Sequence, residues 1–426
     1  MAKGPNILFH RPAFFRPAFY LGINFDLYYV PVIWRIDWYK IATAPTCASN
    51  QSRSHGLSST WVETKISLDF YRILYFLWGF LAYFAMNGTE KQQKTTKSFK
   101  LSSYLLALRP WSFSASFIPV VLGAVICWKT TGNFSFILLL LTMVSVLGVH
   151  AAGNLVNTYY DYMKGVDSKV SDDRTLVDHL LTPKEVVNLG VVSYGLASFA
   201  LVFLVGLSPA KMEHLSFLFF GGLSGSFLYT GGVGLKYYGV GDIVIVITFG
   251  PLAVLFSYLT QCGSVALFPL FYAIPVALST EAILHSNNTR DMEADKKAGA
   301  VTLAIILGHQ LSYALYCLLL LAPYVICAVL SVNLSVRFLV PLTTLGMAFK
   351  LEKSFREGKL MLLPRQTAKL NLMFGLLYIV SCTVAPLSLH IKWFDSAVSS
   401  SFGAFFQVIY NKQHGDSWSA ELQKEW

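Results

Sequence analysis

The stretch FSFILLLLTMVSVLGVHAAGNLVNTYYDYMKGVD, residues 134–167, passes from an apolar run into a polar cluster that begins at Asn154. A second polar cluster, NNTRDMEAD over residues 287–295, follows another apolar run in the same way. Ionisable groups are costly inside a bilayer and are usually functional where they occur. Two carboxylate-rich clusters at matching membrane depth therefore predict one divalent-metal site, built from both halves of the chain.

Composition places the chain among the polytopic membrane proteins. Hydrophobic residues make up 54% of the 426, and charged residues make up only 13%. A typical soluble domain has roughly twice that charged fraction. The net charge of +10 does not indicate a nucleic-acid partner, because the Lys and Arg residues lie in loops between apolar runs.

The cysteines show no metal-binding or redox spacing. None of them forms a CxxC pair, and most lie inside apolar runs. We therefore interpret them as small core side chains rather than as disulfide or redox groups. The six residues are Cys47, Cys127, Cys262, Cys317, Cys327 and Cys382.

Hydropathy predicts an all-α bundle of nine transmembrane helices. Windows of about 19 apolar residues mark a membrane-spanning helix, and the eighth predicted span is the shortest. The predicted spans are residues 112–129, 134–157, 186–207, 215–234, 240–260, 264–286, 308–331, 336–351 and 368–391.

The bundle is expected to occupy residues 100–391, between two other regions. Residues 1–99 are expected to form an N-terminal extension that is partly disordered or membrane-associated, and residues 392–426 a polar tail. The apolar run at 70–86 suits a signal anchor, an interfacial helix or a further span, and Met86 is an alternative start.

The distribution of loop charges predicts the orientation in the membrane. Residues 86–109 carry five Lys or Arg against one Glu, and residues 350–369 carry six against two. With nine spans these segments fall on one side, which the positive-inside rule makes cytoplasmic. The loops at 158–185 and 287–300 then share that side, so both polar clusters are expected to face the cytoplasm.

Helical periodicity groups the polar side chains of the first cluster. Asn154, Asn157 and Asp161 share one helical face, because their spacing is i, i+3, i+7. Asp167 lies off that face, beyond Gly165, which is expected to end the helix. Its carboxylate can reach the site only if the chain turns at this point.

The second cluster forms a similar stripe. Asp291 and Asp295 are spaced i, i+4, and Glu281, Asn288 and Asp295 fall within about 40° of one another on a helix. The stripe is thus expected to run from inside the membrane to its cytoplasmic rim.

The chemistry of these residues suits a diphosphate bound through Mg²⁺. Mg²⁺ prefers oxygen ligands and commonly bridges protein carboxylates to phosphates. The basic side chains of Lys164, Arg174, Lys236 and Arg290 lie close in sequence and could neutralise the remaining charge. The alternative interpretation is that these are solvated charges at helix ends, which is weaker for two clusters on one face.

A diphosphate site at the rim of an aromatic-rich bundle predicts a lipid diphosphate as substrate. Ionisation of an allylic diphosphate gives a carbocation, which aromatic faces can stabilise and a dry cavity protects from water. Each candidate alone is more often an interfacial anchor. The candidate aromatic residues are Tyr159, Tyr160, Tyr229, Tyr237 and Tyr238.

The two clusters resemble the two aspartate-rich motifs of the UbiA superfamily of intramembrane aromatic prenyltransferases. LRPWSFSAS at 108–116, SDDRTLVD at 171–178, YTGG at 229–232 and the run at 282–303 extend the resemblance over roughly residues 100–391. They are most similar to the animal branch, which forms menaquinone-4 (vitamin K2). Thr158 stands where many members have Asp, which leaves one carboxylate fewer.

The resemblance implies a nine-helix bundle with a central lipid-accessible cavity. It also implies Mg²⁺-dependent transfer of a geranylgeranyl group from geranylgeranyl diphosphate to reduced menadione, a naphthoquinol. The implied metal-binding residues are Asn157, Asp161, Asp167, Asp291 and Asp295. The implied substrate-binding residues are Asn154, Asn157, Lys164, Arg174, Tyr229, Lys236, Asn287, Asn288 and Arg290.

The resemblance further implies endoplasmic reticulum and Golgi membranes and association with a sterol-synthesis reductase. Asp161, Asp291 and Glu281 are the predicted catalytic residues. Glu281 lies inside the sixth predicted span, where it would accept a hydrogen bond from the quinol hydroxyl or, alternatively, join two helices. Two functional alternatives remain, which are a prenyltransferase for a benzoquinone-type acceptor and a non-enzymatic membrane carrier.

Overall fold

A computed structural model describes residues 101–167 and 173–387 of the chain. The N-terminal extension at 1–99, with its apolar run and Met86, and the tail at 392–426 lie outside these described residues. The described part is almost entirely helical, and its single isolated β-bridge joins Tyr238 to Val301. The expectation of an all-α protein is confirmed.

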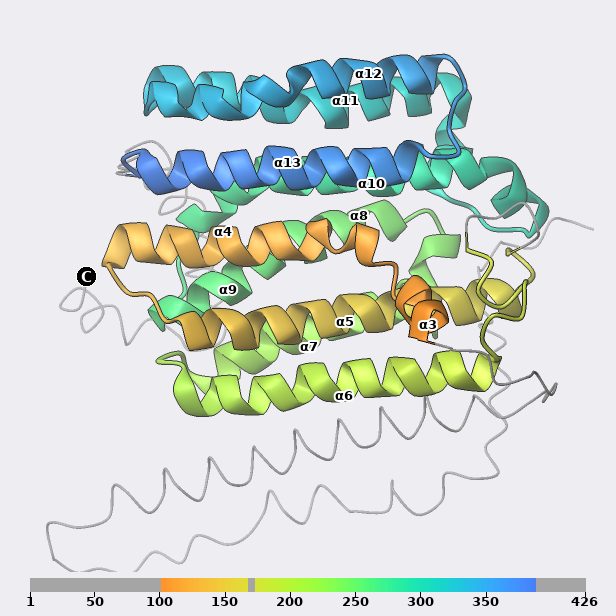
Figure 1. Ribbon diagram of the computed structural model, residues 1–426, viewed down its shortest axis with the longest axis horizontal. Coiled ribbons are helices and arrows are strands. Elements are labelled where there is room, and N and C mark those ends of the chain that lie inside the picture. The colour runs from red at the N-terminus through yellow and green to blue at the C-terminus, as the bar shows by residue number, and fades with distance from the viewer. Residues whose placement is uncertain (1–100, 168–172, 388–426) are drawn as a thin grey trace, which may run out of the picture. The chain divides into compact units, whose positions relative to one another are not determined.

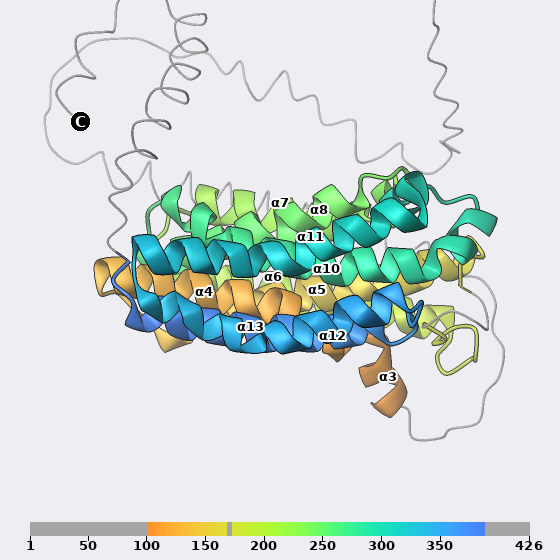
Figure 2. The same ribbon diagram turned by 90° about the horizontal axis from the view of Figure 1, so that it is seen from above.

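The helices lie side by side, with their long axes roughly aligned (Figure 1). Helices α5 and α6 pack together, as do α10 and α11, while α4 packs between α9 and α13. Viewed from above, α12 and α13 lie on one face and α7 and α8 on the other (Figure 2). The α-helices are α3 (Leu101–Ala107), α4 (Ser114–Thr131), α5 (Phe136–Met163), α6 (Pro183–Leu207), α7 (Met212–Leu228), α8 (Gly241–Ile247), α9 (Ala253–Cys262), α10 (Phe268–Lys297), α11 (Leu303–Asn333), α12 (Leu345–Arg356) and α13 (Leu363–Val384).

Short helices of other types connect or interrupt these elements. Three are 3-10 helices, and η4 is a π-helix that joins α8 to α9 without a break in the helical path. They are η2 (Pro110–Ser112), η3 (Leu235–Tyr237), η4 (Thr248–Leu252) and η5 (Val336–Thr344).

Seven helical segments in the described residues are long and apolar enough to cross a membrane. They correspond to seven of the nine predicted spans. The remaining two predictions fall on α7, which has 17 residues, and on η5 with α12, where a 3-10 helix precedes a 12-residue α-helix. The count of nine is therefore not confirmed, although both elements pack within the bundle.

The two helices that carry the polar clusters extend further than hydropathy predicts. Helix α5 continues through the first cluster to Met163, and α10 continues through the second to Lys297. Gly165 follows α5 with a left-handed φ of 72°, as expected of a helix-ending glycine. The backbone N–H of Asp167 then donates to the Asp161 carbonyl at 3.3 Å, which turns the chain back toward the helix.

Close approach between helices depends on small residues. A Cβ atom at Gly123 of α4 would lie 2.4 Å from the Val254 carbonyl oxygen of α9, and a Cβ atom at Gly153 of α5 would lie 2.4 Å from the Ser226 hydroxyl of α7. No side chain fits at such distances, so these glycines allow the helices to touch along their backbones.

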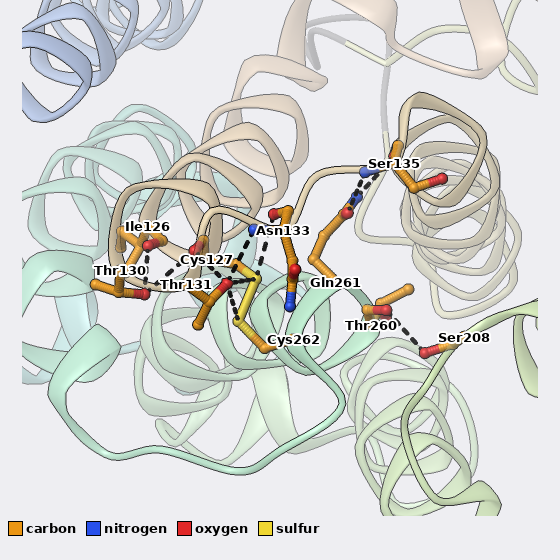
Figure 3. The surroundings of a disulfide bond; sticks show 10 residues. All are labelled: Ile126, Cys127, Thr130, Thr131, Asn133, Ser135, Ser208, Thr260, Gln261 and Cys262. Carbon is orange, nitrogen blue, oxygen red and sulfur yellow. Dashed lines mark hydrogen bonds between the residues drawn. A yellow bond between two sulfur atoms is a disulfide. The ribbon is translucent and has the colours of Figure 1, made fainter.

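A disulfide bond joins the last turn of α4 to the last residue of α9 (Figure 3). It links Cys127 to Cys262, whose Cα atoms are 5.8 Å apart. The interpretation of the cysteines as core side chains without disulfides is wrong for this pair. Local sequence spacing could not reveal the bond, because 135 residues separate the two cysteines. Cys327 and Cys382 are free and buried, as that interpretation expects.

Hydrogen bonds reinforce the end of the bundle that carries the disulfide. The Gln261 side chain accepts from the backbone N–H of Ser135 at 2.8 Å and donates to the carbonyl of the same residue at 3.0 Å. The Ser208 hydroxyl donates to the Thr260 carbonyl at 2.7 Å. The start of α5 and the end of α6 are thereby anchored to the end of α9.

Thiol counting tests the disulfide directly. In protein purified without reductant and then denatured, Cys127→Ser should raise the number of maleimide-reactive thiols by one, because it frees Cys262. Cys327→Ser is the matched control and should lower the number by one, because Cys327 is already a free thiol. If Cys127→Ser also lowers the number, the two cysteines are not bonded.

Candidate active site

A large cavity in the described residues lies between α4, α5, α7, α10 and the α8–α9 segment. It encloses about 1610 Å³, counted to its open mouth. Its inner wall is apolar and includes Val149, Phe219, Phe249 and Phe256, whereas the end near the loops after α5 and α10 is polar. The cavity can therefore receive a molecule with a long apolar part and an anionic head.

All five predicted metal-binding residues line the polar end of this cavity. Asn157 and Asp161 come from α5, and Asp167 follows the turn after that helix. Asp291 and Asp295 come from α10 on the opposite wall. The structure thus brings together two clusters that lie more than one hundred residues apart in the sequence.

Asp161 is the most tightly bound carboxylate of the first cluster. It is 3% exposed, and its oxygens accept hydrogen bonds from Lys236 Nζ at 2.8 Å and from the Tyr237 hydroxyl at 2.7 Å. Burial alone would lower the pKa of Lys236, but the carboxylates of Asp161 and Asp295 raise it above its ordinary value. The lysine therefore remains charged and joins the two acidic walls.

Asp167 has a different environment. Burial raises the pKa of its carboxyl to about 7, and the negative charges of Asp161 and Asp173 act in the same direction. A bound cation would oppose that repulsion and favour the ionised carboxylate. The side chain is therefore suited to a partner that carries positive charge.

The donor atoms fit a magnesium ion that is shared with a phosphate ligand. Both carboxylate oxygens of Asp295 are buried and have no hydrogen-bond partner in the described residues. Among those residues, no three Asp, Glu, His or Cys side chains lie close enough to enclose a metal by themselves. The carboxylate oxygens at this end of the cavity suit Mg²⁺, which also binds water and phosphate oxygens.

Two of the four predicted phosphate-binding cations line the cavity. These are Lys236 and Arg290, and Arg290 also binds Asp291 at 2.8 Å and the Asn287 side chain at 2.8 Å. Lys164 instead places Nζ 3.5 Å from the centre of the Tyr237 ring. Arg174 is half-exposed outside the cavity and pairs with Asp178 at 2.9 Å.

The predicted amide and aromatic residues also divide into two groups. Asn154, Asn287 and Tyr229 line the cavity, and the Asn154 amide donates to the Leu108 carbonyl at 2.9 Å. Asn288 is buried behind the cavity wall and donates to Asp242 at 3.4 Å. The remaining tyrosines are spread out, with Tyr159 against Tyr160, Tyr237 on Asp161, and Tyr238 70% exposed.

Glu281 is buried on the same side of α10 as Asn288 and is not among the residues that line the cavity. It shares this side of α10 with His285, whose ring lies 3.6 Å from Asp242 on α8. The prediction that Glu281 acts on the acceptor therefore needs an intermediate group between this carboxyl and the cavity.

Arg109 and Asp173 are site residues that sequence reasoning missed. Both line the cavity and form an ion pair with each other. The Thr158 hydroxyl donates to Asp173 at 2.5 Å, so this carboxylate lies beside the position where Thr158 replaces the more usual Asp. Both residues belong to the quoted 108–116 and 171–178 stretches, but neither stretch shows that the two side chains meet.

The ion pair compensates for an unusual backbone conformation at Arg109 and for the burial of the Asp173 carboxylate. Arg109 has a left-handed φ of 53°, which is rare for a residue with a side chain. Burial would raise the pKa of Asp173, but the Arg109 guanidinium and the Thr158 hydroxyl hold it below its ordinary value. Asp173 is therefore a permanent negative charge that fixes Arg109 at the cavity wall.

A helical membrane bundle whose cavity joins an acidic end to an apolar wall is the arrangement expected of an intramembrane prenyltransferase. Residues 116–359 match the UbiA prenyltransferase family, so the chain belongs to that family. The resemblance noted in the sequence is confirmed, and an enzyme is favoured over the membrane-carrier alternative.

Similar proteins are found across animals. The chain is 58% identical over 287 residues to UbiA prenyltransferase domain-containing protein 1 of Rattus norvegicus, covering 67% of this chain and 85% of the relative. It is 54% identical over 289 residues to the homolog of Drosophila melanogaster, covering 67% and 80%. The apo structure of a UbiA homolog from Aeropyrum pernix K1 shares the fold, with a TM-score of 0.51 at 15% identity over 64% of this chain and 98% of that chain.

Removing the arginine of the missed pair should destabilise the protein. Arg109→Met leaves the Asp173 carboxylate without its counterion, at an expected cost of about 1–3 kcal/mol. Thermal unfolding of the detergent-purified protein measures this loss, and adding Asp173→Asn to the same chain should restore part of it. Equal melting temperatures for wild type and Arg109→Met would show that the pair contributes nothing to stability.

Proposed function

We propose that the protein transfers a geranylgeranyl group from geranylgeranyl diphosphate to a ring carbon of a naphthoquinol such as reduced menadione, forming menaquinone-4. The principal support is that both acidic clusters line one end of a single cavity whose remaining wall is apolar. The similarity to the animal relatives supports the same branch of the family.

The protein binds the donor through its two chemically different parts. Lys236 and Arg290 would neutralise diphosphate oxygens. The residues that would hold the magnesium ion at this head are Asn157, Asp161, Asp167, Asp291 and Asp295. Magnesium, when bound, would supply charge stabilisation to the diphosphate leaving group. The isoprenoid chain occupies the apolar wall, which excludes water from the allylic carbon.

The reaction then requires the acceptor ring to meet the allylic carbon. Aromatic side chains of the cavity, among them Tyr229 and Phe249, can stabilise positive charge on that carbon. The ring carbon supplies the electron pair for the new carbon–carbon bond, and diphosphate leaves with the pair from the broken bond. The ring carbon retains a surplus proton, which must be removed to restore aromaticity.

We further propose that the acidic end faces the cytoplasm, as loop charge predicts. Helix α4 begins near Arg109 at the acidic end, and the α8–α9 segment begins next to Lys236, so their far ends carry Cys127 and Cys262 at the opposite side of the bundle. Disulfides persist in oxidising compartments. This bond therefore supports a lumenal position for its end, as in the endoplasmic reticulum.

The proposed donor site predicts that Lys236 contributes to donor binding and that Arg174 does not. Lys236→Met should raise the Michaelis constant for geranylgeranyl diphosphate by roughly tenfold or more, because a charged hydrogen bond is worth about 1.5–3 kcal/mol. Arg174→Ala should change it little, since this side chain lies outside the cavity. Initial rates at varied donor concentration distinguish the two, and a larger effect of Arg174→Ala would contradict the assignment.

Loss of one carboxylate on α10 should abolish turnover without unfolding the protein. Asp291→Ala should lower transfer from labelled geranylgeranyl diphosphate by at least on the order of 100-fold, because charge on the leaving group loses its stabilisation. Glu213→Ala, an exposed acid at the far end of α7, is the matched control. Near wild-type turnover by Asp291→Ala at saturating Mg²⁺ would exclude a site built from both clusters.

The acceptor is tested in the same assay. A panel of naphthoquinols, benzoquinols and homogentisate presented to the wild-type protein with labelled donor should give a prenylated naphthoquinol. Preferential labelling of a benzoquinol would retain the prenyltransferase activity and change the acceptor class.

A further inference from the structure

Three titratable side chains lie buried behind the cavity wall and have no role in the proposed donor site. Asp242 of α8 is 5% exposed, and Glu281 and His285 of α10 are 4% and 0% exposed. None of them lines the cavity, which α10 faces with Thr280, Leu284 and neighbouring residues. Buried carboxyl groups are costly unless protons or hydrogen bonds compensate their charge, so this cluster needs an explanation.

Hydrogen bonding indicates how protons are arranged in the cluster. The His285 Nε2 lies 3.0 Å from the Ser312 carbonyl oxygen, which can only accept, so this nitrogen carries a hydrogen. The other ring nitrogen, Nδ1, lies 3.6 Å from an oxygen of Asp242. This distance is longer than a hydrogen bond, so in the described residues Nδ1 faces Asp242 without a direct bond.

Asp242 also lies against two further polar groups of α10. The Asn288 amide donates to its other carboxylate oxygen at 3.4 Å. Glu281 lies one helical turn before His285 on the same face of α10, so its buried carboxyl is on the side that packs on α8. Asp242 is therefore the centre of a compact buried group formed with Glu281, His285 and Asn288.

Tyr229 connects this cluster with the cavity. Its ring lines the cavity and packs on Gly241, where a Cβ atom would lie 3.0 Å from Tyr229 Cε2. Gly241 immediately precedes Asp242 in α8. The Tyr229 ring thus lies between the cavity and the segment that carries Asp242.

We propose that the Asp242–Glu281–His285 cluster receives, through Tyr229, the proton that the aromatic acceptor releases on prenylation. This inference rests on the proposed function. The carbon–hydrogen bond of the prenylated ring carbon breaks, and its electron pair restores the aromatic ring. The proton passes to the Tyr229 oxygen while the phenol proton passes to Asp242, so no oxidant or reductant is needed.

The division of roles follows from the positions. Tyr229 is the catalytic residue of this step, because it alone among the four faces the acceptor space. Asp242, Glu281 and His285 act through it and are positioning residues. The cluster explains how Glu281 can serve the reaction although its own carboxyl does not reach the cavity.

The test compares acceptor carrying hydrogen with acceptor carrying deuterium at the reacting ring carbon, at saturating donor, in the full-length protein. With wild type the two rates should be nearly equal, because formation of the new bond limits turnover. In Asp242→Asn, which preserves shape, turnover should fall by about 10²-fold and proton removal should become limiting, with a rate ratio of about two or more. The donor Michaelis constant should not change.

Two further variants separate this role from a structural one. Glu281→Gln should also raise the isotope ratio, and it replaces Asp242→Asn if that protein does not fold. Ser286→Ala removes a buried hydroxyl of α10 that bonds only the Ile283 carbonyl at 2.8 Å, and it should leave the ratio at the wild-type value. Loss of stability alone would lower the amount of active protein without changing the ratio.

The outcomes distinguish the two hypotheses. Folded Asp242→Asn or Glu281→Gln protein with an unchanged isotope ratio would overturn the relay and assign the proton to another acceptor, such as the departing diphosphate. Such a result would leave the proposed function intact if wild type prenylates the quinol. Failure of wild type to prenylate any aromatic acceptor would overturn both.

Discussion

The need to neutralise buried carboxylates inside an apolar bundle governs this structure. Asp161 is almost fully buried, and Lys236 and Tyr237 satisfy it from the segment between α7 and α8. The negative charge of Asp295 on α10 also stabilises the protonated form of this lysine, so one cation interacts with both halves of the protein. Removing one partner of such a buried pair costs far more than the pair contributes to stability, which ties the placement of these segments to the acidic site.

Local sequence patterns were sufficient for the features that depend on near neighbours. Hydropathy located every long helix, and i, i+3, i+4 spacing placed Asp161 with Asn157 and Asp291 with Asp295 on cavity-facing surfaces. Gly165 ends α5 as expected, and the turn that follows it brings Asp167 to the cavity. These inferences succeed because helix geometry converts sequence spacing directly into position on a face.

The features that the sequence did not reveal are contacts between distant segments. The Arg109–Asp173 pair spans 64 residues, the disulfide spans 135, and Asp242 meets a helix that begins 26 residues later. Periodicity placed Glu281, Asn288 and Asp295 on one stripe. It could not show that only Asp295 lines the cavity, whereas Asn288 bonds Asp242 of α8. Such orientation is decided by packing between helices, for which a single sequence carries no periodic signal.

The disulfide also constrains the order in which the protein is assembled. Cys127 emerges with α4, whereas its partner arrives only after α5, α6, α7, α8 and α9 have been made, 135 residues later. At a synthesis rate of about 5–20 residues per second, this delay is on the order of 10 s. The bond can therefore close only around a set of helices that have already been inserted. Once closed, it prevents α4 and α9 from separating. A formed disulfide therefore indicates that all the helices from α4 to α9 have been synthesised.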